Sequence, residues 1–290
     1  MYDRILIGID FSDSSVETVR WAVSRFPAAE LTLFHAIEPL SAPGYLAREI
    51  GSRLDILREK ELDARTNLEH LAEGMGLDAR VEVRHGWTPE AVAVAAEEAG
   101  AELVVVGAHR KRINPTDELG NTCAAIVRKA SVPVLVWRPV RNEKDKTVLA
   151  ALDLREGSAP IAATAARYAD YFKARLLLVH AIPGTLHGYM RAVSHPPMVE
   201  ETMRRLEKGA RLDAMARVPA DLRDKLTTQV VIVRGKPVVG HILQVAEREA
   251  ADLIVIGKYH APGLRSRVLL GGITSQIIQT ANCSVLTVPL

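Results

Sequence analysis

The feature that most constrains the fold is a pattern of strand-like and helix-like segments that occurs twice, with a period of about half the chain. A short apolar run of β-type residues ends at Asp10 in the first half, and a similar run ends at Asp153 in the second. The runs that follow, LTLFHA and LLLVHA, both finish on a His-Ala pair. Each half alternates five strand-like runs with four helix-like segments, which is typical of a parallel α/β sheet. A repeat this long predicts two duplicated domains in tandem and not a solenoid.

A polar segment, RPVRNEKDK, separates the two halves and contains Pro139. Proline within a run of charged residues marks a linker. We therefore expect a first α/β domain over residues 1–138, a linker over residues 139–146 and a second α/β domain over residues 147–290. The 290 residues suit this division, since domains usually have about 100–200 residues.

The longest helix-like segment runs from Tyr45 to Gly74 and is mostly charged. Its leucines recur at roughly helical spacing, so we expect them to form the side that faces the core. These residues are Leu54, Leu57, Leu62, Leu68 and Leu71.

Composition argues against a nucleic-acid-binding protein. Apolar residues make up 48% of the chain, which is enough to bury a large core, but aromatic residues make up only 4%. That aromatic content is too low for a stacking platform for single strands. The net charge of +2 is too small for a surface that coats nucleic acid. We therefore expect no nucleic-acid partner.

Cysteine usage and hydropathy indicate a cytoplasmic protein without a membrane span. The two cysteines, Cys123 and Cys283, are far apart in the sequence, which argues against a disulfide framework and a zinc–thiolate site. No apolar run approaches the ~18 residues of a membrane-spanning helix. The N-terminus enters a strand-like run directly and has no signal-peptide pattern.

Charge is distributed unevenly between the two halves. The balance of basic over acidic residues is −5 for residues 1–145 and +7 for residues 146–290. An anionic ligand would therefore be favoured in the second half. The alternative is a drift of solvated surface charge without functional meaning.

Asp10 and Asp153 each follow the first strand of their domain. In a doubly wound sheet, ligands bind beyond the carboxyl ends of the strands, near the point where strand order reverses. A carboxylate there can accept hydrogen bonds from an adenine or a ribose. The alternative is an aspartate that caps a turn or a helix. The matched positions indicate a site that was present in the ancestral domain.

A glycine-containing loop follows the fourth strand of each half and leads into a helix. The first copy reads GAHRKRINPTDELGN and the second reads GKYHAPGLRSRVLLGG. Glycines let the backbone approach a ligand, and the free N–H groups at a helix N-terminus attract anions. The pattern predicts phosphate binding, and the alternative is an inherited scaffold without a ligand.

The tandem repeat, the aspartate after the first strand, the glycine after the fourth strand and the closing run NCSVLTV resemble the universal stress protein family. The resemblance spans nearly the whole chain, twice. It implies two doubly wound domains, each a five-stranded parallel sheet in the order 3-2-1-4-5 with helices on both faces. It also implies ATP, with Mg²⁺, or another adenine nucleotide as ligand. Pairing through the last strands is implied as well, in a homodimer or in a pseudo-dimer within one chain.

The nucleotide-binding branch of this family carries a Gly-x2-Gly-x9-Gly-Ser/Thr motif, in which Asn is seen at the last place. In the first half Gly107 and the pair Gly120-Asn121 match this motif in register. Arg110 stands at the second glycine, and two carboxylates inside the loop would repel a triphosphate. We therefore expect a degenerate first-domain site, made up of Asp10, Gly107, Arg110, Gly120 and Asn121.

The second copy is the better candidate, although it departs from the motif as well. His260 stands at the second glycine, ten residues precede Gly271 where the motif has nine, and Gly272 occupies the Ser/Thr place. The loop is nevertheless basic and rich in glycine. The expected site has Asp153, Ala181 and Ile182 on the adenosine side, and it has Gly257, His260, Arg265, Arg267, Gly271, Gly272 and Thr274 around the phosphates.

Catalytic and metal-binding patterns are missing from the sequence. It has no phosphate-loop lysine motif, no nucleophile elbow and no zinc-protease motif. We therefore name no catalytic residue and expect at most slow ATP hydrolysis, which the resemblance implies for some members. His35 and His180 form a matched pair at strand ends, which favours a structural role, such as a hydrogen bond to the backbone, over catalysis.

Three hypotheses about function follow from the sequence, and the weakest of them is an ATP-dependent enzyme, because catalytic groups are missing. In the first, the chain is a cytoplasmic stress-response protein that binds ATP in its second domain and acts as a regulatory module. In the second, it is a nucleotide-free, dimeric interaction scaffold whose two sites have degenerated. The departures at Arg110, His260 and Gly272 support the second hypothesis.

Overall fold

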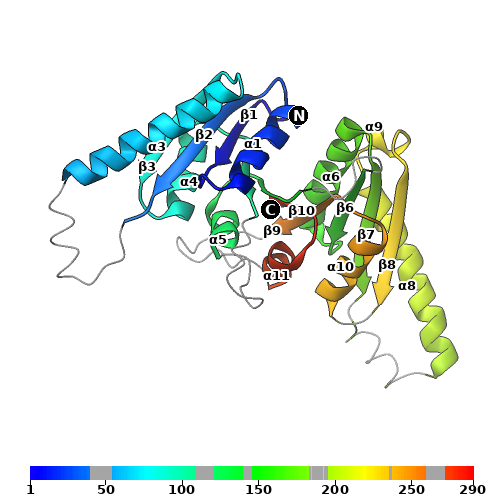
Figure 1. Ribbon diagram of the computed structural model, residues 1–290. Coiled ribbons are helices and arrows are strands. Elements are labelled where there is room, and N and C mark those ends of the chain that lie inside the picture. The colour runs from blue at the N-terminus through cyan, green and yellow to red at the C-terminus, as the bar shows by residue number, and fades with distance from the viewer. Residues whose placement is uncertain are drawn as a thin grey trace. The chain divides into compact units, whose positions relative to one another are not determined.

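The structure is a computed structural model in which residues 1–39, 54–108, 121–139, 146–182, 184, 192, 195–234, 237–258 and 272–290 are described. The chain divides into two compact units, Met1–Trp137 (unit 1) and Arg138–Leu290 (unit 2). Each unit contains one parallel sheet with helices packed on it (Figure 1). Of the segment expected to be the linker, only Pro139 and Lys146 fall within the described residues.

Unit 1 contains five parallel strands in the order β3-β2-β1-β4-β5. They are β1 (Arg4–Gly8), β2 (Glu30–Ile37), β3 (Ala79–His85), β4 (Leu103–Gly107) and β5 (Val134–Trp137). The described helices are α1 (Asp13–Arg25), α3 (Leu54–Gly74), α4 (Thr88–Glu98) and α5 (Asn121–Lys129). The central strands are apolar runs buried on both faces, because helices cover both sides of a parallel sheet.

Unit 2 repeats this arrangement with the strand order β8-β7-β6-β9-β10. Its strands are β6 (Thr147–Leu152), β7 (Arg175–Ile182), β8 (Thr228–Arg234), β9 (Leu253–Lys258) and β10 (Ser284–Pro289). The helical segments are η1 (Glu156–Ser158), α6 (Ala159–Phe172), α8 (Pro196–Ala216), α9 (Ala220–Arg223), α10 (Val238–Arg248) and α11 (Gly272–Thr280). The predicted fold class, two tandem α/β domains with strand order 3-2-1-4-5, is confirmed.

The two faces of each sheet are covered by different helices. Right-handed crossovers place α1 and α3 on one face of unit 1 and α4 and α5 on the other, and α4 and α5 contact each other. The same rule places α6 and α8 opposite α10 and α11 in unit 2, where α10 and α11 are in contact. The position of Gly257 in β9 agrees with this arrangement, because a Cβ there would meet Ile161 of α6.

Strand order reverses at one point in each unit, between β1 and β4 in unit 1 and between β6 and β9 in unit 2. Parallel strands place their carboxyl ends at the same edge of the sheet. Asp10 and Gly107 therefore lie at neighbouring strand ends in unit 1, and Asp153 and Gly257 lie at neighbouring strand ends in unit 2. This edge is where ligands bind in doubly wound sheets.

Within the described parts of the chain, no helix combines the length and apolar character needed to cross a membrane.

Candidate functional site

The first strand of each unit is followed by the same turn. Asp10 Oδ1 accepts hydrogen bonds from Ser12 N at 3.1 Å and from Ser12 Oγ at 2.5 Å. Asp153 Oδ1 accepts one from Arg155 N at 3.0 Å. The residue between has a left-handed backbone in both units, with φ of 60° at Phe11 and 58° at Leu154. Such a φ is uncommon outside glycine, so its repetition indicates a conformation that the fold requires.

A buried serine completes each turn. Ser15 Oγ donates to Ser12 O and Ser158 Oγ donates to Arg155 O, both at 2.8 Å. In unit 1 the Ser12 side chain also caps α1 by accepting from Ser15 N at 3.3 Å. These bonds hold the turn against the following helix and leave each aspartate exposed at the surface.

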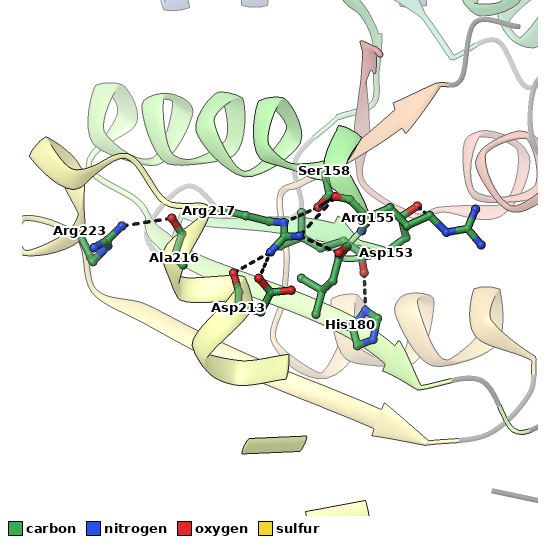
Figure 2. Close-up of polar contacts among 10 residues, drawn as sticks. Asp153, Arg155, Ser158, His180, Asp213, Ala216, Arg217 and Arg223 are labelled. Carbon is green, nitrogen blue, oxygen red and sulfur yellow. Dashed lines mark hydrogen bonds and ion pairs between the residues drawn. The ribbon is translucent and has the colours of Figure 1, made fainter. Parts of the chain in front are cut away.

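Unit 2 adds an arginine to this turn, as Figure 2 shows. Arg217 follows α8, and its guanidinium donates from Nη2 to Leu154 O and from Nε to Ser158 Oγ, both at 2.6 Å. Arg217 Nη1 donates to Asp213 O at 3.0 Å and forms an ion pair with the Asp213 carboxylate. No sequence pattern points to Arg217, because it lies 63 residues from Leu154 and in no local motif.

Helix packing gives a physical reason for the two glycines at the ends of β4 and β9. A Cβ at Gly107 would lie 2.9 Å from Thr18 Oγ1, and a Cβ at Gly257 would lie 2.6 Å from Leu290 Cδ1 and 2.8 Å from Ile161 Cδ1. Separations under 3.0 Å essentially never occur for a real Cβ. Both glycines therefore let a strand end lie close to its neighbours, whether or not a ligand binds.

The helix after each glycine loop is tied to the glycine that precedes the loop. Thr274 Oγ1 donates to Gly257 O at 2.9 Å, and Cys123 Sγ donates to Gly107 O at 3.6 Å. The Thr274 hydroxyl is buried, and its proton is used in this bond. Gly272, at the start of α11, is exposed, and a Cβ there would meet no atom of the described residues within 4 Å.

Lys258 is a second residue of this edge that was not expected from the sequence. It is the last residue of β9 and it has no exposed surface, whereas Ala108 stands at the matched position in unit 1. Burial disfavours the ammonium form and lowers the pKa of Lys258 from 10.5 to about 8. The sequence does place a lysine directly after an apolar strand run. Lysines at such positions are usually exposed, so burial of Lys258 was not expected.

The adenosine side of the expected site includes the end of β7. The Ile182 side chain is buried against Val199 and Met203 of α8, so only its backbone is available to a ligand. Ala181 is half-buried. His180 Nδ1 lies 2.8 Å from Leu152 O, and His35 Nδ1 lies 2.7 Å from Ile9 O. The predicted structural role of this histidine pair is therefore confirmed.

Several residues of the expected sites fall outside the described parts of the chain. These are Arg110 and Gly120 in the first half and His260, Arg265, Arg267 and Gly271 in the second. Asn121 is the first residue of α5. Among the described residues, no group of His, Cys, Asp and Glu side chains is arranged to hold a metal ion.

Comparison with known proteins shows the family of this chain. The sequence profile of the Universal stress protein family matches residues 1–138 and 145–289. A universal stress protein of Mycolicibacterium smegmatis is 27% identical over 292 residues, covering 98% of this chain and 96% of the relative. A universal stress protein of Thermus aquaticus is 34% identical over 145 residues, covering 49% of this chain and 98% of the relative.

Two solved structures have the same fold over 99% of this chain. A functionally unknown protein from Pseudomonas aeruginosa PAO1 superposes with a TM-score of 0.66 at 16% identity, over 92% of that protein. A universal stress protein from Archaeoglobus fulgidus superposes with a TM-score of 0.66 at 17% identity, over 98% of that protein. Because the family profile matches both halves, the chain belongs to the universal stress protein family as a tandem, two-domain member.

Proposed function

We propose that unit 2 binds an adenine nucleotide, ATP with Mg²⁺, and that the chain acts as a cytoplasmic stress-response module regulated by that nucleotide. One observation carries the proposal. Asp153 and Gly257 lie at the carboxyl ends of the adjacent strands β6 and β9, where strand order reverses. The following helix, α11, begins at an exposed glycine, Gly272.

The described residues suit the adenosine side of such a site. The exposed Asp153 carboxylate can accept a hydrogen bond from an adenine amine or a ribose hydroxyl, and its orientation is held by Arg155 N. Ala181 and Ile182 contribute backbone groups at the end of β7, next to β6 in the sheet. Family membership supports this assignment.

The phosphates are assigned to the segment between Gly257 and Thr274. His260, Arg265, Arg267 and Gly271 are in this segment by sequence, and the first N–H groups of α11 follow at Gly272. Free N–H groups at a helix N-terminus attract phosphate, and the basic balance of the second half favours an anion. The hydroxyl of Thr274 contributes indirectly, by holding the start of α11 at the end of β9.

The unit 1 site is proposed to be degenerate. Its carboxylate, Asp10, accepts both the amide and the hydroxyl of Ser12, so one of its oxygens is already used twice. Arg110 and the acidic loop residues weaken phosphate binding further. Binding is therefore assigned to unit 2, and no residue of either unit is assigned a catalytic role.

The nucleotide content of freshly purified protein tests the proposal. The protein is denatured, and the released nucleotides are separated by anion-exchange chromatography, with Gly271→Val and Gly120→Val treated in parallel. ATP or ADP present in the wild type and lost only with Gly271→Val supports a site in unit 2. If no nucleotide is released, and none binds when ATP and Mg²⁺ are added back, the proposal is wrong.

The alternative function is a nucleotide-free scaffold that works as a dimer through its terminal strands, β5 and β10. The packing around Gly107 and Gly257 favours this alternative, because it accounts for both glycines without a ligand. Pairing through these strands stays a prediction, and sedimentation velocity measures whether one chain or two form the particle in solution. A scaffold would keep its partners and its mass when Asp153 and Gly271 are both replaced.

A further inference from the structure

One peptide group in unit 2 is held from both of its ends. The carbonyl oxygen of the Leu154–Arg155 peptide accepts a hydrogen bond of 2.6 Å from Arg217 Nη2. The N–H of the same peptide donates a hydrogen bond of 3.0 Å to Asp153 Oδ1. Arg217 and Asp153 are therefore connected through a single rigid, planar group. Figure 2 shows the guanidinium pointing into the turn from the end of α8.

This connection is stronger than an ordinary turn contact. A guanidinium is permanently charged, and hydrogen bonds from charged donors are shorter and stronger than neutral ones. Withdrawal of electron density at the carbonyl oxygen also strengthens the N–H at the other end of the peptide as a donor. Leu154 has the left-handed backbone of the turn, a conformation that leucine rarely adopts. A contact from outside the turn therefore helps to stabilise this conformation.

Arg217 itself is fixed from the side of α8. Its side chain is 15% exposed, and the Asp213 carboxylate one helical turn earlier forms an ion pair with it. Its Nε donates to the buried Ser158 hydroxyl, so the fork of the guanidinium contacts both sides of the turn. A second arginine, Arg223, donates to Ala216 O at 3.2 Å and to Val218 O at 3.0 Å, and neither of these contacts reaches the turn.

In unit 1 the corresponding turn is held by residues that are part of the turn or pack directly on it. Ser12 donates both its N–H and its hydroxyl to Asp10 Oδ1. Phe11, which matches Leu154, packs on His35 with ring centroids 4.6 Å apart. The segment after α3, from Met75 to Asp78, contains no arginine or lysine. Among the described residues, the arginine contact therefore distinguishes the turn of unit 2 from the turn of unit 1, whose nucleotide site is proposed to be degenerate.

We infer that Arg217 is a positioning residue for the adenosine side of the unit 2 site. It orients the Leu154–Arg155 peptide, and that peptide orients the Asp153 carboxylate toward the ligand. The inference rests on the proposed function, since a ligand at Asp153 is what the orientation serves. It also links the site to α8, so that ligand binding at the turn and the position of the end of α8 depend on each other.

The test combines affinity with a double-mutant cycle. Arg217→Met keeps the aliphatic stem and removes the guanidinium, and Arg217→Lys keeps the charge without the fork. Arg223→Met is the matched control, because it removes an arginine from the same segment that does not contact the turn. Binding of ATP and of adenosine, each with Mg²⁺, is measured by calorimetry for these proteins, for Asp153→Ala and for the Asp153→Ala/Arg217→Met double variant.

We expect Arg217→Met to weaken ATP and adenosine binding by the same factor, about tenfold, which corresponds to 1.4 kcal/mol. Arg217→Lys should recover part of the loss, and Arg223→Met should leave both affinities unchanged even where it lowers the melting temperature. In the Asp153→Ala background, Arg217→Met should cause no further loss. An equal loss in both backgrounds, or wild-type affinity for Arg217→Met, would overturn the inference.

Amide hydrogen exchange at Arg155 separates the failure of this inference from the failure of the proposed function. If the wild type binds neither ATP nor adenosine, the proposed function is wrong and the exchange data decide the role of Arg217. Exchange that becomes at least about tenfold faster in Arg217→Met, but not in Arg223→Met, supports orientation of the peptide by Arg217. Equal exchange in all three proteins would show that Arg217 does not hold the turn.

Discussion

The hydroxyl of Thr274 donates a hydrogen bond of 2.9 Å to the carbonyl oxygen of Gly257 and so ties the first turn of α11 to the end of β9. Both groups are buried. The two residues are 17 positions apart, and the whole glycine loop lies between them. This contact therefore sets how far apart the two ends of the loop can be.

Replacing Thr274 by valine should lower the free energy of unfolding by about 1–3 kcal/mol, because it leaves a buried carbonyl without this donor. Valine has nearly the same shape, so the loss measures the hydrogen bond and not the packing. Thr274→Ser is the control, since it keeps the hydroxyl and removes one methyl group. Urea unfolding followed by circular dichroism gives both values, and equal stability of the valine variant and the wild type would contradict the prediction.

Replacing Gly257 by alanine should destabilise unit 2 by about 1–3 kcal/mol through overpacking. The added Cβ would lie 2.6 Å from Leu290 Cδ1 and 2.8 Å from Ile161 Cδ1. Leu290→Ala removes the first of these atoms, so the double variant should lose less than the sum of the two single variants. Thermal unfolding of the four proteins checks this, and strict additivity would show that the Leu290 side chain simply moves away.

The fold could be predicted from the sequence because its signals are local and occur twice. Apolar runs such as Leu103–Val106 alternate with helical patterns, and the matched pair His35 and His180 marks the same strand end in each half. One packing detail was wrong. Leu62 was expected to face the core, but it is 64% exposed, and Leu57 is 36% exposed.

The reason lies in the spacing along α3. The buried residues of its described part recur every four positions, at Ala64, Leu68 and Ala72. Alanines let the helix approach the sheet closely, and they carry too little hydrophobicity to stand out among the leucines of a charged helix.

The contacts that build the candidate site were harder to predict than the fold. Arg217 reaches Leu154 across 63 residues, and Leu290 fills the space beside Gly257 only because β10 lies next to β9. Such contacts depend on tertiary structure, and no pattern within one segment reports them. Asp153 and Gly257 could be predicted because their place at strand ends follows from the strand pattern itself.

Replacing Gly272 by serine should strengthen ATP binding severalfold. The family motif has Ser or Thr at this place, and a Cβ at Gly272 would meet no atom of the described residues within 4 Å. A hydroxyl in the first turn of α11 would add one donor to the free N–H groups there. Gly272→Ala is the control, since it adds the Cβ without the hydroxyl. Calorimetric titration with ATP and Mg²⁺ distinguishes the two variants. Equal affinity of both would show that the phosphates do not bind at the first turn of α11.

Replacing Lys258 by methionine should remove part of the pH dependence of the protein's stability. Burial lowers the pKa of Lys258 from 10.5 to about 8, so the folded state binds this proton less tightly than the unfolded state does. The resulting penalty is fully present below pH 8, falls as the pH rises from 8 to 10.5, and is about 3 kcal/mol at its largest. The wild type should therefore become more stable across this window relative to Lys258→Met, which has nearly the same volume and no charge.

Urea unfolding at pH 7, 8, 9 and 10 measures the difference between the wild type and Lys258→Met. The matched substitution in unit 1, Ala108→Lys, places a lysine at the end of β4, where Ala108 is half-buried and the new side chain can reach solvent. Ala108→Lys should therefore change the pH dependence of the free energy of unfolding little. A constant difference between the wild type and Lys258→Met at all four pH values would mean that Lys258 stays charged in the folded protein. In that case an anionic group near the end of β9 would have to compensate the buried ammonium.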